Sequence, residues 1–234
     1  MHKLWGGFLV VFTLALGGFA LVSMQKTAED NKITQRIAGV QVGCDEDTLE
    51  ERVKCRIENE DNPDVLIMPE ECRPFTSGEQ ERCVDRYKNL DKCWNQPLGS
   101  KRSLCAMEVL GIKKSVKISW QECAKTSDVT LQTICKKMVR QAALNLAKFR
   151  MDDLSERVID QVQNKKLTID KAVGFIVTVE KNKVKLQNAK NYTDQKKALD
   201  STRTAWRNLV NKNKLKNMSN DYLQQSYADL AAVK

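Results

Sequence analysis

Histidine, proline and glycine are scarce in this chain of 234 residues, which has one histidine, His2, four prolines and ten glycines. Without a histidine beyond position 2, acid–base catalysis would depend on carboxylates, lysines or tyrosines. The motifs G-x-S-x-G, G-x-x-x-x-G-K-[ST], G-x-G-x-x-G and H-E-x-x-H are also absent from the sequence. We therefore expect no enzymatic activity, no catalytic residues and no cofactor. An enzyme without a recognisable motif is kept as the last alternative.

Closely spaced cysteine pairs are missing as well, although the chain has eight cysteines. Structural zinc sites bring ligands in pairs such as C-x2-C, whereas the shortest gap here leaves nine residues between Cys83 and Cys93. Thiol oxidoreductases need a C-x-x-C pair, and none exists. We expect neither a metal site nor redox catalysis, so the cysteines are interpreted as structural disulfides of an oxidising compartment.

Runs of β-branched residues are few, and long stretches are rich in Lys, Gln, Leu and Ala, which favours helix over strand. We expect an all-α fold with an N-terminal transmembrane or signal helix, disulfide-clamped helical hairpins and then a basic helical bundle. The predicted division is a membrane anchor or signal peptide over 1–24, a linker over 25–43, a cysteine-rich region over 44–140 and basic amphipathic helices over 141–234.

Leu4 to Met24 is an unbroken run without a charge. A helix of this length is able to cross the hydrocarbon core of a bilayer. Gly18 and Ala20 are small residues at the two positions that a signal peptidase reads, so cleavage after Ala20 and secretion is the alternative. Because the apolar run continues past Ala20, we favour an anchored protein whose bulk lies in the periplasm, at the cell exterior or in a lumen.

The cysteine positions show a numerical symmetry. The residue numbers of Cys44 and Cys83 have the same sum as those of Cys55 and Cys72, and the same holds for Cys93 with Cys135 and Cys105 with Cys123. Residues at one level of an antiparallel helical hairpin share a constant sum, because both helices rise equally per residue. We therefore predict the nested disulfides Cys44–Cys83, Cys55–Cys72, Cys93–Cys135 and Cys105–Cys123. The first hairpin would turn at Asn62-Pro63-Asp64, and the second near Lys114.

Two helices clamped in this way resemble the twin-cysteine helical hairpins of the mitochondrial intermembrane space, whose cysteine pairs are typically nine residues apart. The spacers here are ten residues in the first set, Cys44 to Cys55 and Cys72 to Cys83, and eleven in the second. The resemblance covers less than half of the chain and concerns geometry, which indicates shared physics rather than kinship. Eight cysteines allow 105 pairings, and the other pairings stay open.

Charge is distributed unevenly along the chain. Residues 41–100 hold 8 basic against 15 acidic residues, residues 101–140 hold 9 against 3, and residues 141–234 hold 18 against 10. These charges are either solvated helix faces or complementary surfaces. In the second interpretation, the acidic part docks on the basic part of the same or a neighbouring molecule, or the basic part faces an anionic lipid or polymer surface.

Four helices are expected after residue 127, with caps at Ser127 and Asp128, Thr168 and Asp170, Thr193 and Asp194, and Ser219 to Asp221. The apolar positions of the first are interpreted as the face that packs in the core: Leu131, Cys135, Met138, Val139, Ala142, Leu146 and Phe149. A basic face is expected around six lysines, which would support binding to a membrane or partner: Lys181, Lys183, Lys185, Lys190, Lys196 and Lys197. Aromatic residues are not interleaved with them, which argues against nucleic-acid binding.

The acidic pairs Glu70-Glu71 and Asp152-Asp153 are interpreted as exposed caps and helix faces rather than catalytic dyads. Together these features predict a non-enzymatic, membrane-anchored, disulfide-stabilised helical scaffold or interaction protein. We expect it to contact the membrane through Leu4 to Met24 and to bind a protein partner, with an anionic surface as a further partner. The alternative is a secreted cationic protein that binds a membrane, polymer or receptor. The sequence does not determine the oligomeric state.

Overall fold

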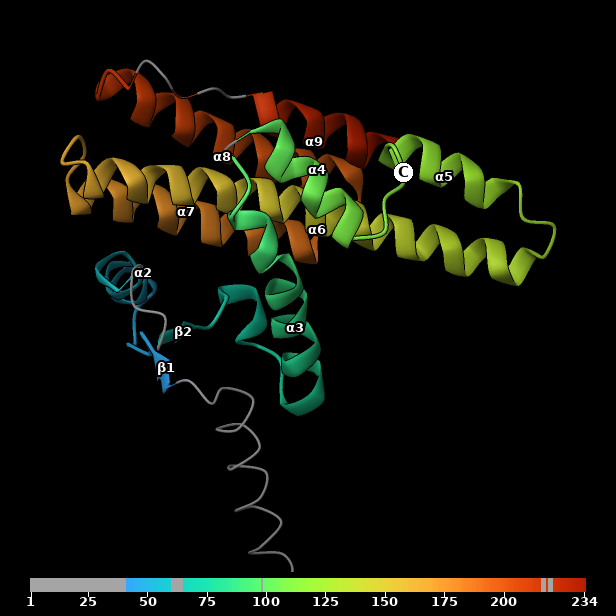
Figure 1. The fold of residues 1–234 in the computed structure, drawn as a ribbon, viewed down its shortest axis with the longest axis horizontal. Helices are drawn as coiled ribbons and strands as arrows, with labels where there is room; N and C mark the ends of the chain where they lie inside the picture. Colours follow the sequence, from blue (N-terminus) through green and yellow to red (C-terminus); the bar gives the residue numbers. More distant parts are fainter. Residues whose placement is uncertain (1–40, 60–64, 98, 216–217, 219–220) are drawn as a thin grey trace, which may run out of the picture.

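A computed structural model describes residues 41–59, 65–97, 99–215, 218 and 221–234. Over these residues the chain is almost entirely helical (Figure 1), so the predicted helical class is confirmed. A pair of three-residue parallel strands, with Gln41 opposite Val65, is the exception. The elements are β1 (Gln41–Gly43), α2 (Leu49–Glu58), β2 (Val65–Ile67), the 3₁₀ turn η1 (Glu70–Cys72), α3 (Ser77–Trp94), α4 (Ser100–Val109), α5 (Val116–Ala124), α6 (Val129–Gln163), α7 (Ile169–Asn188), α8 (Tyr192–Lys212) and α9 (Asp221–Ala232).

The 35-residue helix α6 is the centre of the fold, and α7, α9, α5 and α4 all pack against it. Its segment Lys148–Ser155 is buried on every side, which is unusual for a helix that also carries charges. The apolar core extends from Leu154 of α6 through Ile176 of α7 to Trp206 of α8 and Leu230 of α9. The second half of the chain therefore forms the predicted helical bundle, drawn in yellow to red in Figure 1.

The predicted helix starts in this bundle are confirmed to within two residues. Asp128 caps α6 by accepting hydrogen bonds from the backbone N–H groups of Thr130 and Leu131, at 2.7 and 3.0 Å. Thr168 is the N-cap of α7. In α8 the cap is Asn191 rather than Thr193, because its side-chain oxygen accepts the N–H of Asp194 at 3.0 Å.

The first predicted hairpin does not form. Helix α2 packs chiefly against α7, whereas α3 contacts α4 and η1 (Figure 1). The second arm of the predicted hairpin is not a continuous helix, because Cys72 lies in the short turn η1 and a regular helix begins only at Ser77. Without a long second helix, α2 buries Val53 and Ile57 against the bundle instead. The predicted turn at 62–64 lies outside the described residues.

The nested disulfide pairing is wrong, since each cysteine is bonded to its neighbour in the sequence. The four disulfides are Cys44–Cys55, Cys72–Cys83, Cys93–Cys105 and Cys123–Cys135. Each one joins cysteines that are 11 or 12 positions apart in the sequence and fixes one corner of the chain. Such short loops lose less entropy on closure than the much longer loops that the outer nested pairs, Cys44–Cys83 and Cys93–Cys135, would need.

Candidate functional site

Lys183 of α7 is the centre of a buried cluster of charges. Its side chain is almost fully buried, with 1% of its surface exposed. The Nζ atom lies 2.6 Å from Asp152 Oδ1 of α6, 3.0 Å from Glu180 Oε2 of α7 and 3.3 Å from Glu71 Oε2 of η1. One ammonium group thus joins three carboxylates from three elements. We call Glu71, Lys148, Asp152, Glu180 and Lys183 the charge cluster.

Lys148 of α6 contributes the second ammonium group of the charge cluster. Its Nζ lies 3.5 Å from Glu71 Oε1 and donates a hydrogen bond of 2.9 Å to Gln187 Oε1. The Tyr87 hydroxyl of α3 donates a hydrogen bond to the same Glu71 oxygen. Glu71, which comes from the acidic part of the sequence, is therefore held by two lysines of the basic part.

Arg56 connects α2 to the edge of the charge cluster. Its guanidinium lies 2.5 Å from Glu156 Oε1 of α6 and 3.4 Å from Glu180 Oε1 of α7. Arg52, one turn earlier on α2, binds both carboxylate oxygens of Glu70 at 2.8 Å. A bidentate pair of this kind is stronger and more directional than a single hydrogen bond. Together these contacts fix the small N-terminal elements to the bundle.

Burial and the lysines shift the pKa values of the charge cluster. Burial raises the pKa of Asp152 to about 7, and Glu180 and Glu71 add to this, while Lys183 opposes it. Burial would also raise the pKa of Glu71, but Lys183 and Lys148 outweigh it and lower this pKa to about 2. Burial lowers the pKa of the Lys183 ammonium, but the carboxylates outweigh burial and raise it well above its usual value. The cluster therefore shifts the pKa values of its carboxyl groups in opposite directions, that of Asp152 up and that of Glu71 down.

A cavity of about 240 Å³ lies beside the charge cluster, lined by residues of α2, η1, α3, α6 and α7. Arg52, Arg56 and Lys183 line it, and each is already in an ion pair with a carboxylate. Because these basic side chains already pair with carboxylates, the cavity is better suited to holding the surrounding elements together than to binding a charged ligand. Elsewhere, Cys44, Glu46 and Cys55 come within 4.8 Å of one another, but the two sulfurs are bonded to each other and cannot ligate a metal.

A second buried network fixes α4 and α9 to α6. The guanidinium of Arg150 donates hydrogen bonds to Asp229 Oδ2 at 2.7 Å, to Ser103 Oγ at 3.1 Å and to Ser226 Oγ at 3.2 Å. Asp153 lies 2.9 Å from Arg102 of α4 and 2.8 Å from Arg157, one turn later on α6. The charged residues of α6 therefore face five different elements, α2, η1, α4, α7 and α9, which explains why the middle of this helix is buried all round.

The interpretation of Glu71, Asp152, Asp153 and Lys183 as exposed residues is wrong, because all four are buried. The sequence does contain a signal for the burial of Lys183. Ile176, Val179, Lys183 and Leu186 follow one another at helical spacing, so the lysine lies in the apolar stripe of α7. A lysine in such a stripe requires a buried carboxylate. Nothing in the spacing identified Glu71, which comes from a distant part of the chain.

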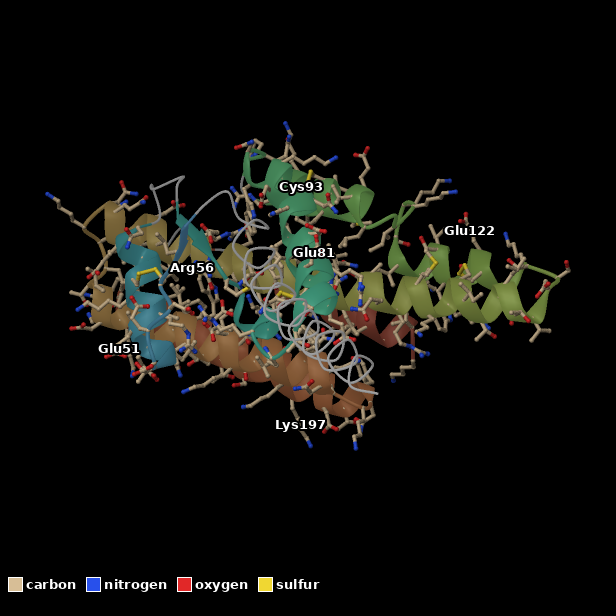
Figure 2. The ribbon with its side chains drawn as sticks, turned by 90° about the horizontal axis from the view of Figure 1, so that it is seen from below. Glu51, Arg56, Glu81, Cys93, Glu122 and Lys197 are labelled. Atoms are coloured by element: carbon tan, nitrogen blue, oxygen red, sulfur yellow. A yellow bond between two sulfur atoms is a disulfide. The ribbon has the colours of Figure 1, made fainter. Side chains whose placement is uncertain are left out.

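Helix α5 and the first turns of α6 form a two-helix arm, residues 112–140, that extends beyond the rest of the molecule in both views (Figures 1 and 2). Cys123–Cys135 joins its two helices near the tip. Trp120 contacts Lys136 and Arg140 on one flank, with the charged groups 5.8 and 5.4 Å from the ring centroid. The arm is therefore held by a disulfide and by contacts within itself.

Part of the apolar stripe assigned to the core of α6 is exposed on this arm. Leu146 and Phe149 are buried as predicted. Leu131 and Met138, however, are 55% and 67% exposed, and Ile134 between them is 50% exposed. The prediction is wrong for Leu131 and Met138 because α6 projects past α7 and α8, so no helix of the bundle covers its first three turns.

Comparison of the chain with protein-family models, with curated proteins and with solved structures finds no match. None of the helices described is both long and apolar enough to span a membrane. The predicted anchor, Leu4 to Met24, lies outside the described residues, as does most of the predicted linker.

Proposed function

We propose that the chain is a non-enzymatic helical scaffold or interaction protein, anchored to a membrane by Leu4 to Met24, with its folded part in an oxidising extracytoplasmic compartment. The observation that carries this proposal is that all eight cysteines form disulfides, two of which are fully internal to the small N-terminal elements. Disulfides persist in secreted, periplasmic and luminal proteins and are rare in the cytosol. The long uncharged run supports the anchor.

The interaction role is supported by how the charges are used. Four buried or half-buried basic residues form ion pairs that join elements of the fold to one another: Lys183, Lys148, Arg56 and Arg150. The same contacts support a rigid body that presents surfaces rather than a catalytic cleft. The secreted alternative rests on Gly18 and Ala20, which fit a cleavage site after Ala20.

The test begins with the intact mass of the protein purified from its native membrane, before and after reduction and alkylation. We expect residues 1–20 to be present, eight alkylations only after reduction, and retention in the membrane during carbonate extraction. Peptide mapping should give the four sequential disulfides. Free thiols without reduction would contradict the oxidising compartment.

An Ala20→Leu variant separates anchoring from secretion, because a large residue at this position blocks a signal peptidase. If the wild-type chain is anchored, both proteins keep residues 1–20 and stay in the membrane. Their masses then differ only by the mass of the substitution. If wild type begins at Leu21 and Ala20→Leu alone stays in the membrane, the secreted alternative is correct.

A further inference from the structure

The arm, residues 112–140, carries most of the large hydrophobic side chains that are exposed in the described part of the chain. Six large hydrophobic side chains there are more than a third exposed, and five of them belong to the arm: Ile118, Val129, Leu131, Ile134 and Met138. The sixth is Leu104 of α4, at 59%. A cluster of exposed apolar side chains on a protein surface is typical of an interaction site.

Four of these side chains lie on one flank of the arm. At 100° per residue, Leu131, Ile134 and Met138 fall within about 60° of one another on α6. They lie on roughly the opposite side of this helix from Lys136 and Arg140, which contact Trp120. Ile118 lies on roughly the opposite side of α5 from Trp120, and therefore on the same flank as the other three. We call Ile118, Leu131, Ile134 and Met138 the apolar flank.

Lysines border the apolar flank. On α6, Lys137 lies about 60° from Ile134, and Lys125, the C-cap residue of α5, lies within about 20° of Ile118. Both lysines are exposed. Over the whole arm, seven basic residues stand against two acidic ones, giving a net charge of +5. Long basic side chains beside an apolar surface can keep their aliphatic stems on that surface while their charged ends reach the polar headgroups of a lipid bilayer.

From this arrangement we propose that the arm docks on an anionic lipid bilayer, with the apolar flank at the headgroup boundary and its bordering lysines at the lipid phosphates. A second copy of the chain fits less well. Pairing arm to arm would bring two charges of +5 together. The acidic part, over residues 43–59 and 68–97, whose side chains the structure describes, offers no large exposed hydrophobic side chain to cover the apolar flank. An amphipathic basic surface is what an anionic bilayer binds.

The proposal rests on the proposed membrane anchor only for proximity, because an anchored chain would hold the arm near the bilayer. The test uses the full chain in lipid nanodiscs of phosphatidylcholine alone or with about one third phosphatidylglycerol. Hydroxyl-radical labelling followed by peptide mapping reports the exposure of Leu131, Ile134 and Met138. Leu104 serves as an internal control, because it is exposed to a similar degree but lies on α4.

We expect the apolar flank to be protected in the anionic nanodiscs and not in the neutral ones, while Leu104 labels equally in both. The protection should be lost at about 1 M salt, where the Debye length falls to about 3 Å. Equal labelling of the flank in both lipids overturns the proposal. Protection that appears in detergent and grows with protein concentration also overturns it, and assigns the flank to a second copy.

Two matched double variants localise the charge effect. Replacing Lys125 and Lys137 by Gln should weaken binding of the arm to anionic lipid by about tenfold or more, since each lysine near such a surface adds severalfold. The same change at two exposed lysines outside the arm, Lys185 of α7 and Lys190 in the loop that follows it, should leave the binding unchanged. Equal losses in both variants would assign binding to overall charge and refute a site on the arm.

Glu122 provides a test in the opposite direction, because this carboxylate lies on the same side of α5 as Ile118 (labelled in Figure 2). Glu122→Gln should strengthen protection by anionic lipid. If the native chain begins at Leu21 and has no anchor, the proposed function fails, whereas flotation of this shorter chain with anionic vesicles still tests the arm.

Discussion

Removing the ammonium group at the centre of the charge cluster is the perturbation whose effect follows most directly from the structure. Lys183→Met keeps most of the length and volume of the side chain but leaves three carboxylates, on Glu71, Asp152 and Glu180, without the cation that lies within 3.3 Å of each. Breaking a buried ion pair by removing one partner typically costs about 3–5 kcal/mol. In a chain of this size that corresponds to a fall in Tm of about 10 °C.

The matched control is Lys196→Met. This lysine of α8 lies 2.8 Å from Asp200, one turn later, but half of its side chain is exposed, so solvent screens the pair. Urea unfolding of both variants with disulfides intact gives the comparison. We expect a large loss of stability for Lys183→Met and little change for Lys196→Met. Equal effects of the two substitutions would refute the conclusion that the charge cluster holds the fold together.

A second substitution tests whether the loss comes from uncompensated charge. Adding Asp152→Asn to Lys183→Met removes one of the three stranded carboxylates, so the double variant should be more stable than Lys183→Met alone. A double variant that loses the sum of the two single effects would mean that the residues contribute independently, in contradiction to the 2.6 Å contact between them.

Three further predictions concern pH, the arm and a helix cap. Because the folded-state pKa of Asp152 is raised to about 7, stability should fall as the pH rises from about 4 to about 7, and Asp152→Asn should make this slope shallower in urea titrations. The depressed pKa of Glu71 acts in the opposite sense below about pH 4.5, where stability should fall with falling pH. Replacing Cys123 and Cys135 together by Ser should speed amide hydrogen exchange in α5 and the start of α6, with the bundle unchanged, because this disulfide joins two positions of the arm that are only 12 apart in the sequence. Asp128→Ala should destabilise the first turn of α6 by about 1 kcal/mol, seen as faster exchange at Thr130 and Leu131.

The spacing of the cysteines in the sequence does not determine how they pair. Equal sums for the nested pairs Cys44–Cys83 and Cys55–Cys72 are algebraically the same condition as equal separations for the sequential pairs Cys44–Cys55 and Cys72–Cys83. The symmetry therefore fits both pairings and cannot distinguish them. Only the position of Cys72, in a short turn rather than on a long helix, decides between them, and it does so in favour of the sequential pairs.

The charge cluster was beyond reach of the sequence for a different reason. The placement of Lys183 in an apolar stripe indicates that it is buried, but its partners Asp152 and Glu71 come from other elements, far from it in the chain. The same limit applies to α6, whose stripe runs from Leu131 to Phe149 without a change in composition. Which part of this stripe is covered depends on where α7 and α8 end, and this is a property of the packed bundle.

The sequence by itself determined the helical class, the starts of the bundle helices and the structural role of the cysteines, because helix caps, apolar periodicity and the lack of close cysteine pairs act over a few residues. Only the tertiary structure decided which cysteines are bonded, which charges are buried together and which apolar side chains remain exposed on the arm. Those outcomes depend on contacts between elements far apart in the chain, where the free energy of burying one face against another outweighs local preference.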